Sequence, residues 1–317
     1  MMSRTFLITG GTGSFGSQAV ETLLQRGVKE LIVFARDEFK HYLLAERWPE
    51  ADWPIRYFVG DVRDKERLWR ALEGVEWVIH AAAMKQVPTC EYNPIEAIKT
   101  NVLGAQNLIE CAIDRGVERV MALGTDKQVN PINLYGATKL CAEKLFMAAN
   151  AYGGGKVKFS VVRYGNVMAS RGSVVPYFQE LAAKNESIPI TDPDMTRFWI
   201  TLPEAVNFVL ERLDDMQGGE IFIPKLPSVN ICSLAYAIKP NCEMHVSGIR
   251  PGEKMHETLI SKDESRHVID NGSYFAIIPE KTGTVVDGFE YRSDTNKWTL
   301  KARELRRVLE GKGIAQE

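Results

Sequence analysis

The sequence predicts an α/β fold in which helices cover both faces of a parallel β-sheet, and three observations support this prediction. Short apolar runs, rich in β-branched residues, alternate with helix-length amphipathic stretches through the first half of the chain. A glycine-rich turn joins the first apolar run to the first amphipathic stretch. No internal repeat or low-complexity tract indicates another architecture.

Helices are expected to separate the strands, and parallel strands with helical crossovers build a doubly wound sheet. We expect helices over residues 15–25, 65–72 and 94–114. The strands are expected at residues 5–9, 30–34, 56–59, 77–80, 119–123 and 159–163.

The pattern loosens after Tyr164, where short segments are separated by proline and glycine. We therefore expect residues 1–165 to form the sheet domain, with later segments returning to it. Residues 166–317 are expected to form mainly a smaller, discontinuous lobe and a C-terminal extension. The stretch 299–309, rich in Lys, Arg and Leu, is expected to be a surface helix that closes the domain.

The composition excludes several classes of protein. The 317 residues are 45% hydrophobic and 25% charged, which excludes a disordered or collagen-like chain. The 39 Lys and Arg against 41 Asp and Glu give a net charge of −2, without a basic block. This charge argues against a nucleic-acid-binding or polybasic membrane surface, so the expected partner is a small molecule.

The cysteines are scattered and include no Cys-x-x-Cys pair, so the sequence predicts neither a disulfide framework nor a metal site. The first expected strand begins at Thr5, which leaves no room for a signal peptide, and no apolar run approaches the roughly 18 residues of a spanning helix. We therefore expect a soluble protein of the reducing cytoplasm. The cysteines are Cys90, Cys111, Cys141, Cys232 and Cys242.

The glycine-rich turn places Gly10, Gly13 and Gly16 at the spacing G-x-x-G-x-x-G between the first strand and the first helix. Glycine lets the chain turn tightly and approach a pyrophosphate without a Cβ, and the helix N-terminus favours negative charge. A glycine pattern alone is often only a turn. Here its place in the first βαβ unit predicts a dinucleotide site of Rossmann type.

The end of the second strand bears on the choice between NAD and NADP. An NAD enzyme usually offers a carboxylate to the ribose 2′-hydroxyl about 20 residues after the last glycine. Here Arg36 stands 36 − 16 = 20 residues on and Lys40 follows, and both cations suit a 2′-phosphate. The neighbouring Asp37 favours NAD, and the two cations also fit a solvated helix start. We expect NADP, with NAD as the alternative.

Further candidates for the cofactor site follow the third and fourth strands. Asp61 and Val62 are placed to accept the adenine amino group and to cover its ring, although Gly-Asp-Val also fits a simple turn. Ala81 and Ala82 are small enough for a cofactor to cross the sheet beside them, and Lys85 lies just beyond.

Tyr135 and Lys139 form the pattern Tyr-x-x-x-Lys, which puts both side chains on one face of a helix. A lysine ammonium beside a phenol lowers the pKa of the phenol and can hold a nicotinamide ribose. The phenolate can then take a proton from a sugar hydroxyl while hydride leaves the carbon. The pattern alone is more often a surface pair, but here it follows the fifth strand and the Thr-Asp-Lys turn at 125–127.

Several long motifs stand in a characteristic order along the chain. They are Thr-Asp-Lys at 125–127, Asn-Pro-Ile-Asn-Leu-Tyr-Gly-Ala-Thr-Lys at 130–139, Arg-Tyr-Gly-Asn-Val at 163–167, Ser-Arg-Gly-Ser-Val-Val-Pro at 170–176, Met-Thr-Arg-Phe-Trp at 195–199 and Arg-Pro-Gly-Glu-Lys at 250–254. From about Arg4 to Ser265 the chain resembles the inverting UDP-N-acetylglucosamine 4,6-dehydratases that open the pseudaminic acid pathway. These are extended short-chain dehydrogenase/reductases. The resemblance implies a lyase that uses NADP, acts on UDP-N-acetylglucosamine and forms a homo-oligomer.

The resemblance also implies a reaction cycle in which the cofactor is reduced and then regenerated. Tyr135 deprotonates the C4 hydroxyl, Lys127 removes the C5 proton and Asp126 assists the loss of water from C6, with Thr125 and Lys139 beside them. Reprotonation of C5 from the opposite face gives UDP-2-acetamido-2,6-dideoxy-β-L-arabino-hex-4-ulose.

The Thr-Asp-Lys turn differs from related hexose dehydratases, which have Thr-Asp-Glu there and use the Asp–Glu pair as acid and base. Lys127 needs a lowered pKa to act as a base, and Asp126 needs a raised pKa to act as an acid. An Asp–Lys surface pair in a loop is the alternative interpretation.

Carried over position by position, the resemblance implies two sets of binding residues. Gly124 departs from the family pattern, which usually has a serine there, and it removes one hydrogen bond that a serine could make to the substrate. Cofactor contacts are implied for Gly10, Thr12, Gly13, Ser14, Phe15, Gly16, Ala35, Arg36, Lys40, Asp61, Val62, Ala81, Ala82, Lys85, Asn101, Tyr135 and Lys139. Substrate contacts are implied for Lys85, Leu123, Gly124, Asn166, Val167, Arg171, Val174, Thr191, Arg197, Arg250 and Glu253.

Two other kinds of function remain open from the sequence. A UDP-sugar 4-epimerase or a retaining 4,6-dehydratase would use the same scaffold, although an epimerase needs no elimination pair. A non-catalytic NADP-binding sensor is disfavoured by the intact Tyr-x-x-x-Lys and Asp-Lys patterns. The residues alone fix neither the stereochemistry at C5 nor the group that reprotonates it.

Overall fold

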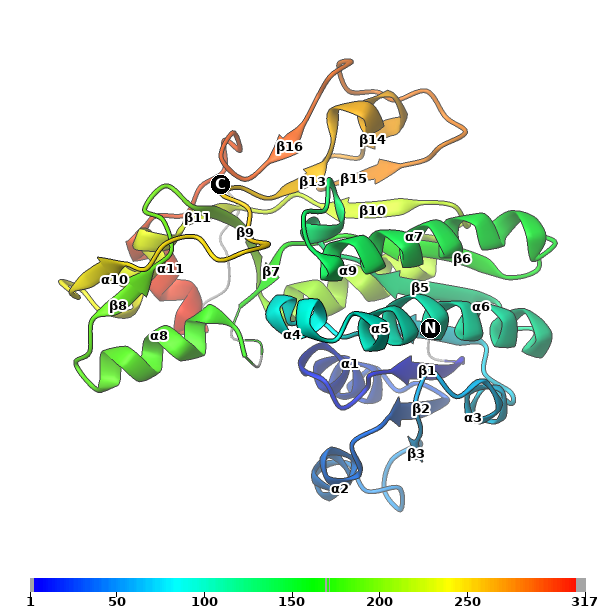
Figure 1. Ribbon diagram of the computed structural model, residues 1–317. Coiled ribbons are helices and arrows are strands. Elements are labelled where there is room, and N and C mark those ends of the chain that lie inside the picture. The colour runs from blue at the N-terminus through cyan, green and yellow to red at the C-terminus, as the bar shows by residue number, and fades with distance from the viewer. Residues whose placement is uncertain (1–2, 169, 171, 312–317) are drawn as a thin grey trace.

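A nine-stranded sheet lies at the centre of the computed structural model, which describes residues 3–168, 170 and 172–311 (Figure 1). From one edge to the other, its strands are β14 (Val268–Asp270), β15 (Tyr274–Ile277), β10 (Ile221–Pro224), β6 (Lys158–Val162), β5 (Arg119–Leu123), β4 (Trp77–His80), β1 (Thr5–Thr9), β2 (Glu30–Ala35) and β3 (Ile55–Val59). The strands from β10 to β3 are parallel, whereas β15 and β14 continue the sheet antiparallel. The predicted α/β class is confirmed, and each expected strand is found within one residue at either end.

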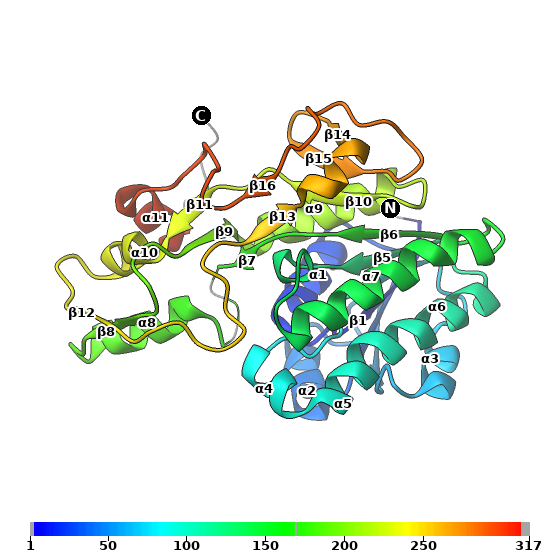
Figure 2. The same ribbon diagram turned by 45° about the horizontal axis from the view of Figure 1, so that its top comes forward.

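Helices cover both faces of this sheet (Figure 2). The neighbours α3 (Lys65–Ala71), α6 (Gly104–Arg115) and α7 (Leu134–Tyr152) pack together on one face, and α1 (Ser14–Gln25) packs with α9 (Leu202–Asp215) on the other. Each helix contributes an apolar stripe to the core, because residues three and four apart share a helix face. Leu23 of α1 and Leu210 of α9 are fully buried there with Phe6 of β1.

Local sequence signals explain several helix boundaries. Asn133 begins α7, since its side-chain oxygen accepts the N–H of Gly136 at 2.7 Å. Thr201 and Glu204 form a reciprocal capping box at the start of α9. Gly116, with a φ of 69°, ends α6 in the left-handed conformation that favours glycine.

The stretch 94–114, expected as one helix, is not a uniform α-helix. It begins as α5 (Pro94–Ile98), widens into the π-helical turn η1 (Lys99–Leu103) and continues as α6, after an unexpected short helix α4 (Val87–Tyr92). The wider turn directs the Asn101 amide to both backbone groups of Met84 and to the Thr138 hydroxyl, at 2.8–3.0 Å. This contact explains the interruption, because it joins the loop after β4 to α7.

A second hydrophobic cluster lies in a smaller part of the structure, around α8 (Val174–Ala183), α10 (Ile231–Ile238) and α11 (Ala302–Leu309). Figure 1 shows it at the left. Helix α11 falls within the expected terminal helix, packs against α10 and buries Leu305. The strands here are β7 (Asn166–Val167), β9 (Thr196–Ile200) and β11 (Ser228–Asn230) in one sheet, and β8 (Ile188–Ile190) paired with β12 (Met244–Val246).

Segments after residue 165 also return to the main sheet, namely α9, β10, β14 and β15. Another pair, β13 (Thr258–Ile260) with β16 (Tyr291–Arg292), contributes Leu259, Ile260 and Tyr291 to the main core. Within residues 3–168, 170 and 172–311, no helix is long and apolar enough to cross a membrane. The same residues contain no group of three or more His, Cys, Asp and Glu side chains that could hold a metal ion.

Candidate active site

A cleft of about 1400 Å³ runs along the carboxyl ends of the parallel strands. The loops after β1, β2, β3, β4, β5 and β6 all line it, which is where a doubly wound sheet binds its ligands. The cleft extends to the smaller part of the structure, where Tyr177, Trp199 and Ile231 line it.

Most of the site residues predicted from the sequence lie along this cleft. Asp126 and Asn101 are buried and do not belong to the described lining. Arg171, another predicted site residue, lies outside the described residues. The lining includes Gly10, Thr12, Gly13, Ser14, Phe15, Gly16, Ala35, Arg36, Lys40, Asp61, Val62, Ala81, Ala82, Lys85, Leu123, Gly124, Thr125, Lys127, Tyr135, Lys139, Asn166, Val167, Val174, Thr191, Arg197, Arg250 and Glu253.

Glycine shapes the turn after β1. Gly10 has a φ of 68°, and a Cβ there would lie 2.9 Å from the backbone nitrogen of Ala82. A Cβ on Gly16 would collide with the Gly10 carbonyl oxygen and with the backbone of Gly11. The first residue of α1, Ser14, also lines the cleft. Bare backbone beside a helix N-terminus fits the pyrophosphate of a dinucleotide.

The acidic and basic candidates after β2 are engaged differently. The Asp37 carboxylate caps α2 (Glu38–Arg47) by accepting the Lys40 N–H at 3.0 Å, and it contacts the Lys40 ammonium at 2.5 Å. The Arg36 side chain is 55% exposed, and its guanidinium lies 3.5 Å from the Asp61 carboxylate. Asp37 is engaged as a helix cap and as the ion-pair partner of Lys40. The Arg36 guanidinium is therefore the more exposed charged group at this end of the cleft.

Tyr135 and Lys139 lie on the first turns of α7, as their spacing predicts. Burial raises the pKa of Tyr135 to about 12, although the Lys127 charge and a hydrogen bond with Thr125 oppose this rise. Burial lowers the pKa of Lys139 to about 8, against the opposing charge of Glu143. The phenol is therefore protonated in the free protein, and the nearby ammonium that lowers its pKa is that of Lys127.

The Thr-Asp-Lys turn forms a short 3-10 helix, η2 (Asp126–Gln128), directly after β5. Its adjacent side chains have different surroundings, because Lys127 lines the cleft whereas Asp126 is fully buried. Oδ1 of Asp126 accepts the Thr125 hydroxyl and the Lys127 ammonium, each at 3.0 Å. Asp126 can therefore reach the cleft only through Thr125 or Lys127.

The charge of Lys127 follows from its neighbours. Burial alone would lower the pKa of Lys127, but the carboxylates of Asp126 and Glu257 outweigh burial and raise it above its ordinary value. The lowered pKa that Lys127 needs to act as a base is therefore not met in the free protein, where the neighbouring carboxylates favour the ammonium. To act as a base, Lys127 must first pass its proton to a neighbouring group.

A buried ion-pair network supports the Thr-Asp-Lys turn from behind. Arg163 is 1% exposed, and its guanidinium donates to Glu143 at 2.6 and 2.7 Å and to Glu264 at 2.7 Å. Glu143 accepts the side-chain amide of Gln128, whose oxygen accepts the Thr125 N–H at 3.0 Å. The network fixes the backbone from which Thr125 reaches the cleft.

The same network explains why Gly124 departs from the serine of the resembled family. A Cβ at this position would lie 2.9 Å from the carbonyl oxygen of Val162 and 3.0 Å from Oε1 of Gln128. Gln128 is fully buried and hydrogen-bonded, so it has little freedom to move away. Glycine at 124 is therefore the residue that this packing accommodates.

Two predicted substrate residues have partners within the protein. The Arg197 guanidinium donates to the carbonyl oxygens of Thr196, Lys254 and Met255 at 2.7–3.0 Å, so it holds a chain segment as well as lining the cleft. Arg250 pairs with Glu253, and 68% of the Arg250 side chain is exposed.

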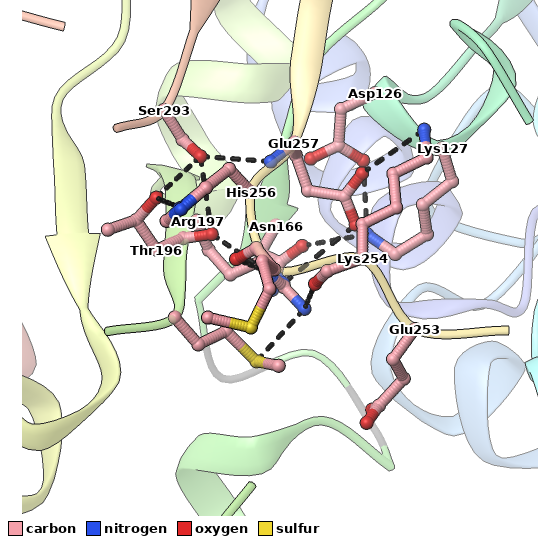
Figure 3. Close-up of polar contacts among 12 residues, drawn as sticks. Asp126, Lys127, Asn166, Thr196, Arg197, Glu253, Lys254, His256, Glu257 and Ser293 are labelled. Atoms are coloured by element: carbon pink, nitrogen blue, oxygen red, sulfur yellow. Dashed lines mark hydrogen bonds and ion pairs between the residues drawn. The ribbon is translucent and has the colours of Figure 1, made fainter. Parts of the chain in front are cut away.

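Sequence reasoning missed Glu257 as a site residue. Its carboxylate lies within 4 Å of the cationic groups of Lys127, Arg197 and Lys254 (Figure 3). Glu257 is 2% exposed and lines the cleft, and its Oε1 lies 3.5 Å from Nζ of Lys127. A single glutamate before a short strand carries no spacing signal, so only the folded chain identifies it.

Gly136 explains how α7 packs closely against the Thr-Asp-Lys turn. A Cβ on Gly136 would collide with the carbonyl oxygen of Lys127. We expect Gly136→Ala to destabilise the protein by about 1–3 kcal/mol, the usual range for overpacking, although alanine is the better helix former. Urea unfolding measures this, with Cys141→Ala, an exposed site on the same helix, as the control. A Gly136→Ala loss no larger than the control would contradict the collision.

Comparison with known proteins identifies the family. A family model described as polysaccharide biosynthesis protein matches residues 6–279, most of the chain. The chain belongs to the polysaccharide biosynthesis protein family. The UDP-N-acetylglucosamine 4,6-dehydratase (inverting) of Campylobacter jejuni subsp. jejuni is 48% identical over 326 residues, covering 96% of this chain and 97% of its own. This similarity confirms the resemblance that the motifs indicate.

Other relatives share the scaffold of this polysaccharide biosynthesis protein. The UDP-glucose 4-epimerase of Rickettsia felis is 42% identical over 287 residues, covering 87% of this chain and 83% of its own. The X-ray structure of Pen from Bacillus thuringiensis superposes with a TM-score of 0.92 at 37% identity, covering 99% of each chain. DesIV, a dTDP-glucose 4,6-dehydratase from Streptomyces venezuelae solved with NAD and TYD, shares the fold, with a TM-score of 0.71 at 24% identity over 79% of this chain and 86% of its own.

Proposed function

We propose that this protein catalyses the NADP-dependent 4,6-dehydration of UDP-N-acetylglucosamine with inversion at C5, giving UDP-2-acetamido-2,6-dideoxy-β-L-arabino-hex-4-ulose. The observation that carries the proposal is that the Tyr135 side chain, the Lys127 side chain and the glycine-rich turn line one cleft. A 4-epimerase needs the phenol and the cofactor site but no further proton-transfer group. The name of the Campylobacter relative supports the same reaction.

The proposed cycle gives Tyr135, Lys127 and Lys139 separate roles in the cleft. NADP, when bound, supplies the acceptor and later the donor of the hydride. Tyr135 takes the proton of the C4 hydroxyl, and Lys139 holds the nicotinamide ribose. The C4 ketone acidifies the C5–H bond, whose proton Lys127 removes, while Thr125 and the buried Asp126 hold the Lys127 turn in place.

The proposed substrate contacts lie toward the smaller part of the structure. We assign the nucleotide end of UDP-N-acetylglucosamine to Arg250, which pairs with the diphosphate, and to Glu253, which accepts from a ribose hydroxyl. Asn166 and Thr191 contact the sugar and its attached phosphate. The carbonyl contacts of Arg197 support a positioning role for this residue, since they hold the segment that carries Glu257.

The choice of NADP rests on the half-exposed Arg36 and on the engaged Asp37 carboxylate. We expect Arg36→Ala to lower kcat/KM for NADP about 10–100-fold, because a charge-assisted hydrogen bond contributes about 1.5–3 kcal/mol. Steady-state kinetics with NADP and NAD measure the change. The value for NAD is expected to stay within about threefold of the wild type, because NAD has no 2′-phosphate for the guanidinium to bind.

Arg56→Ala is the matched control for this prediction, because Arg56 is an exposed cation on β3 that pairs with Glu30 and does not belong to the described cleft lining. This control is expected to keep the wild-type preference. If Arg36→Ala lowers kcat/KM equally for both cofactors, the assignment of a 2′-phosphate site to Arg36 is wrong.

The second candidate function is UDP-sugar 4-epimerisation, which the name of the Rickettsia relative favours. Incubation with UDP-N-acetylglucosamine in deuterated water separates the two. Dehydration gives a product that has lost water and carries deuterium at C5, whereas epimerisation gives an isomer of unchanged mass without deuterium at C5. A product of unchanged mass would therefore contradict the proposed dehydration.

We further propose that the protein works in the cytoplasm as a homo-oligomer and supplies the first step of pseudaminic acid synthesis. The Campylobacter relative supports the reaction class, and the scattered free cysteines fit a reducing compartment. We also propose that residues 166–317 provide mainly the substrate lobe and residues 1–165 the cofactor domain.

A further inference from the structure

Several chain segments bring polar groups together around Lys127 (Figure 3). Its Nζ donates to Oδ1 of Asp126 at 3.0 Å and to Oδ1 of Asn166 at 3.1 Å, and it lies 3.5 Å from Oε1 of Glu257. Lys127 and Glu257 line the cleft, whereas Asp126 does not belong to the described lining. Of the two carboxylates that contact Lys127, Glu257 is the one that reaches the cleft.

The position of Glu257 is fixed by its backbone. Its N–H donates to Oγ of Ser293 at 2.9 Å, and its carbonyl oxygen accepts the Ser293 N–H at 2.9 Å. The neighbouring His256 does not share this site, because its Nδ1 contacts Oγ1 of Thr196 at 2.8 Å and its Nε2 lies 3.9 Å from Asp294. The Glu257 carboxylate is therefore held beside Lys127 without help from the histidine.

The cations beside Glu257 are mainly engaged elsewhere. Lys254 donates to the Val129 carbonyl oxygen at 2.6 Å and stands 3.7 Å from Oε2 of Glu257. Arg197 Nε stands 3.8 Å from Oε1, while its other nitrogens donate to backbone carbonyls. Oε2 is buried and has no hydrogen-bond partner among the described residues. Oδ2 of Asp126 is likewise buried without a hydrogen-bond partner among the described residues, but Glu257 is the carboxylate that lines the cleft, so its Oε2 is the oxygen available to a bound ligand.

We propose that Glu257 is the acid of the elimination step, which receives a proton from Lys127 and passes it to the hydroxyl group that leaves C6. This inference rests on the proposed dehydration and gives Glu257 the role that the sequence alone assigns to Asp126. Related hexose dehydratases carry a glutamate where this chain has Lys127. Here a carboxylate lies 3.5 Å from the Lys127 ammonium and comes from 257 − 127 = 130 residues further along the chain.

The step balances in protons and electrons. Transfer from Nζ of Lys127 to the carboxylate of Glu257 breaks an N–H bond and forms an O–H bond, which leaves an amine and a carboxylic acid. The amine takes the C5 proton, and the electron pair of the C5–H bond becomes the C5–C6 double bond. The C6–O bond breaks, and the oxygen leaves as water with the Glu257 proton. Lys127 is again an ammonium and Glu257 again a carboxylate.

Glu257→Gln tests the proposal because glutamine keeps the shape but cannot supply the acid proton. In a single turnover with NADP and UDP-N-acetylglucosamine, we expect C4 oxidation near the wild-type rate and water loss slowed about 10²–10⁴-fold. The reduced nicotinamide then accumulates and is followed by its absorbance. In the wild type it is only transient, because the hydride returns to C6.

A substrate analogue with fluorine in place of the C6 hydroxyl isolates the acid role, because fluoride departs without a proton. We expect this analogue to restore elimination at least about tenfold in Glu257→Gln but not in Lys127→Met. In the glutamine variant the Lys127 proton must pass to solvent instead of to residue 257, and loss of the Glu257 charge eases this step because that charge raises the Lys127 pKa. Fluoride release, followed by ¹⁹F NMR, measures the rescue.

Two further variants separate the acid role from a structural one. Glu257→Asp keeps an acid and is expected to lose water at least about tenfold faster than Glu257→Gln, a comparison that holds even if the glutamine variant is unstable. Glu220→Gln is the matched control, because Glu220 is also buried but accepts from Ser160 and from the N–H groups of Gln217 and Gly218, away from the cleft. In this control, the elimination rate of the fluorine analogue divided by that of UDP-N-acetylglucosamine is expected to equal the wild-type ratio.

Three results would overturn the role of Glu257: near-wild-type water loss in Glu257→Gln, no rescue by the fluorine analogue, or equal rates in Glu257→Asp and Glu257→Gln. Failure of the proposed function looks different. In that case the wild-type protein itself releases no water from UDP-N-acetylglucosamine, and the inference falls with it.

Discussion

Replacing Tyr135 with phenylalanine is expected to lower turnover of UDP-N-acetylglucosamine about 10²–10⁴-fold, because it removes the phenol to which we assign the C4 proton. The loss falls on the first chemical step, so the reduced nicotinamide should not accumulate in a single turnover. This result differs in kind from that of Glu257→Gln, in which oxidation proceeds and elimination fails. Stopped-flow absorbance with the NADP-loaded protein distinguishes the two variants.

Tyr152→Phe is the matched control for this prediction, since Tyr152 ends the same helix and is 61% exposed. It is expected to turn over at the wild-type rate. A Tyr135→Phe variant that retains more than about a tenth of wild-type C4 oxidation would show that another group takes the C4 proton.

Replacing Lys127 with methionine is expected to slow water loss about 10²–10⁴-fold, because the C5 proton loses its acceptor. C4 oxidation should persist but slow down, since the Lys127 charge lowers the pKa of Tyr135 and its removal leaves the phenol harder to ionise. The sign follows from charge: a cation near a phenol favours the phenolate. The pH at which C4 oxidation reaches half its maximum should therefore shift upward.

Deuterium incorporation at C5 measures the Lys127 prediction directly, with Lys144→Met, an exposed lysine on α7, as the control. The control should incorporate deuterium at the wild-type rate. Incorporation at C5 by Lys127→Met at that same rate would assign the base to a different residue.

The parallel sheet was predictable because helices separate its first six strands and most of these strands are buried apolar runs, although β3 at the edge is only partly buried. Thr5–Thr9, for example, is buried along its whole length. The strands after residue 165 have two to five residues, and proline and glycine separate many of them, so they carry little periodicity. The π-helical turn at 99–103 was also beyond sequence reasoning, since it depends on contacts between Asn101 and distant residues.

The glycine-rich turn and the placement of Tyr135 and Lys139 on one helix were predictable because both depend on local spacing. The direction of Asp126 was not, because adjacent side chains of a short turn point different ways and only packing decides which one reaches the cleft. Glu257 and the Arg163–Glu143 pair come from distant segments, and nothing in their immediate sequence marks them. Tertiary packing therefore determines which acid meets Lys127.

The most direct test of the proposed dehydration is the product formed from UDP-N-acetylglucosamine in deuterated water with NADP. Proton and carbon NMR of that product report the loss of water and the configuration at C5 together. The proposal predicts a 4-keto-6-deoxy sugar of L-arabino configuration with deuterium at C5. A UDP-sugar that keeps its C6 hydroxyl, or a 6-deoxy product that keeps the D-configuration at C5, would contradict it.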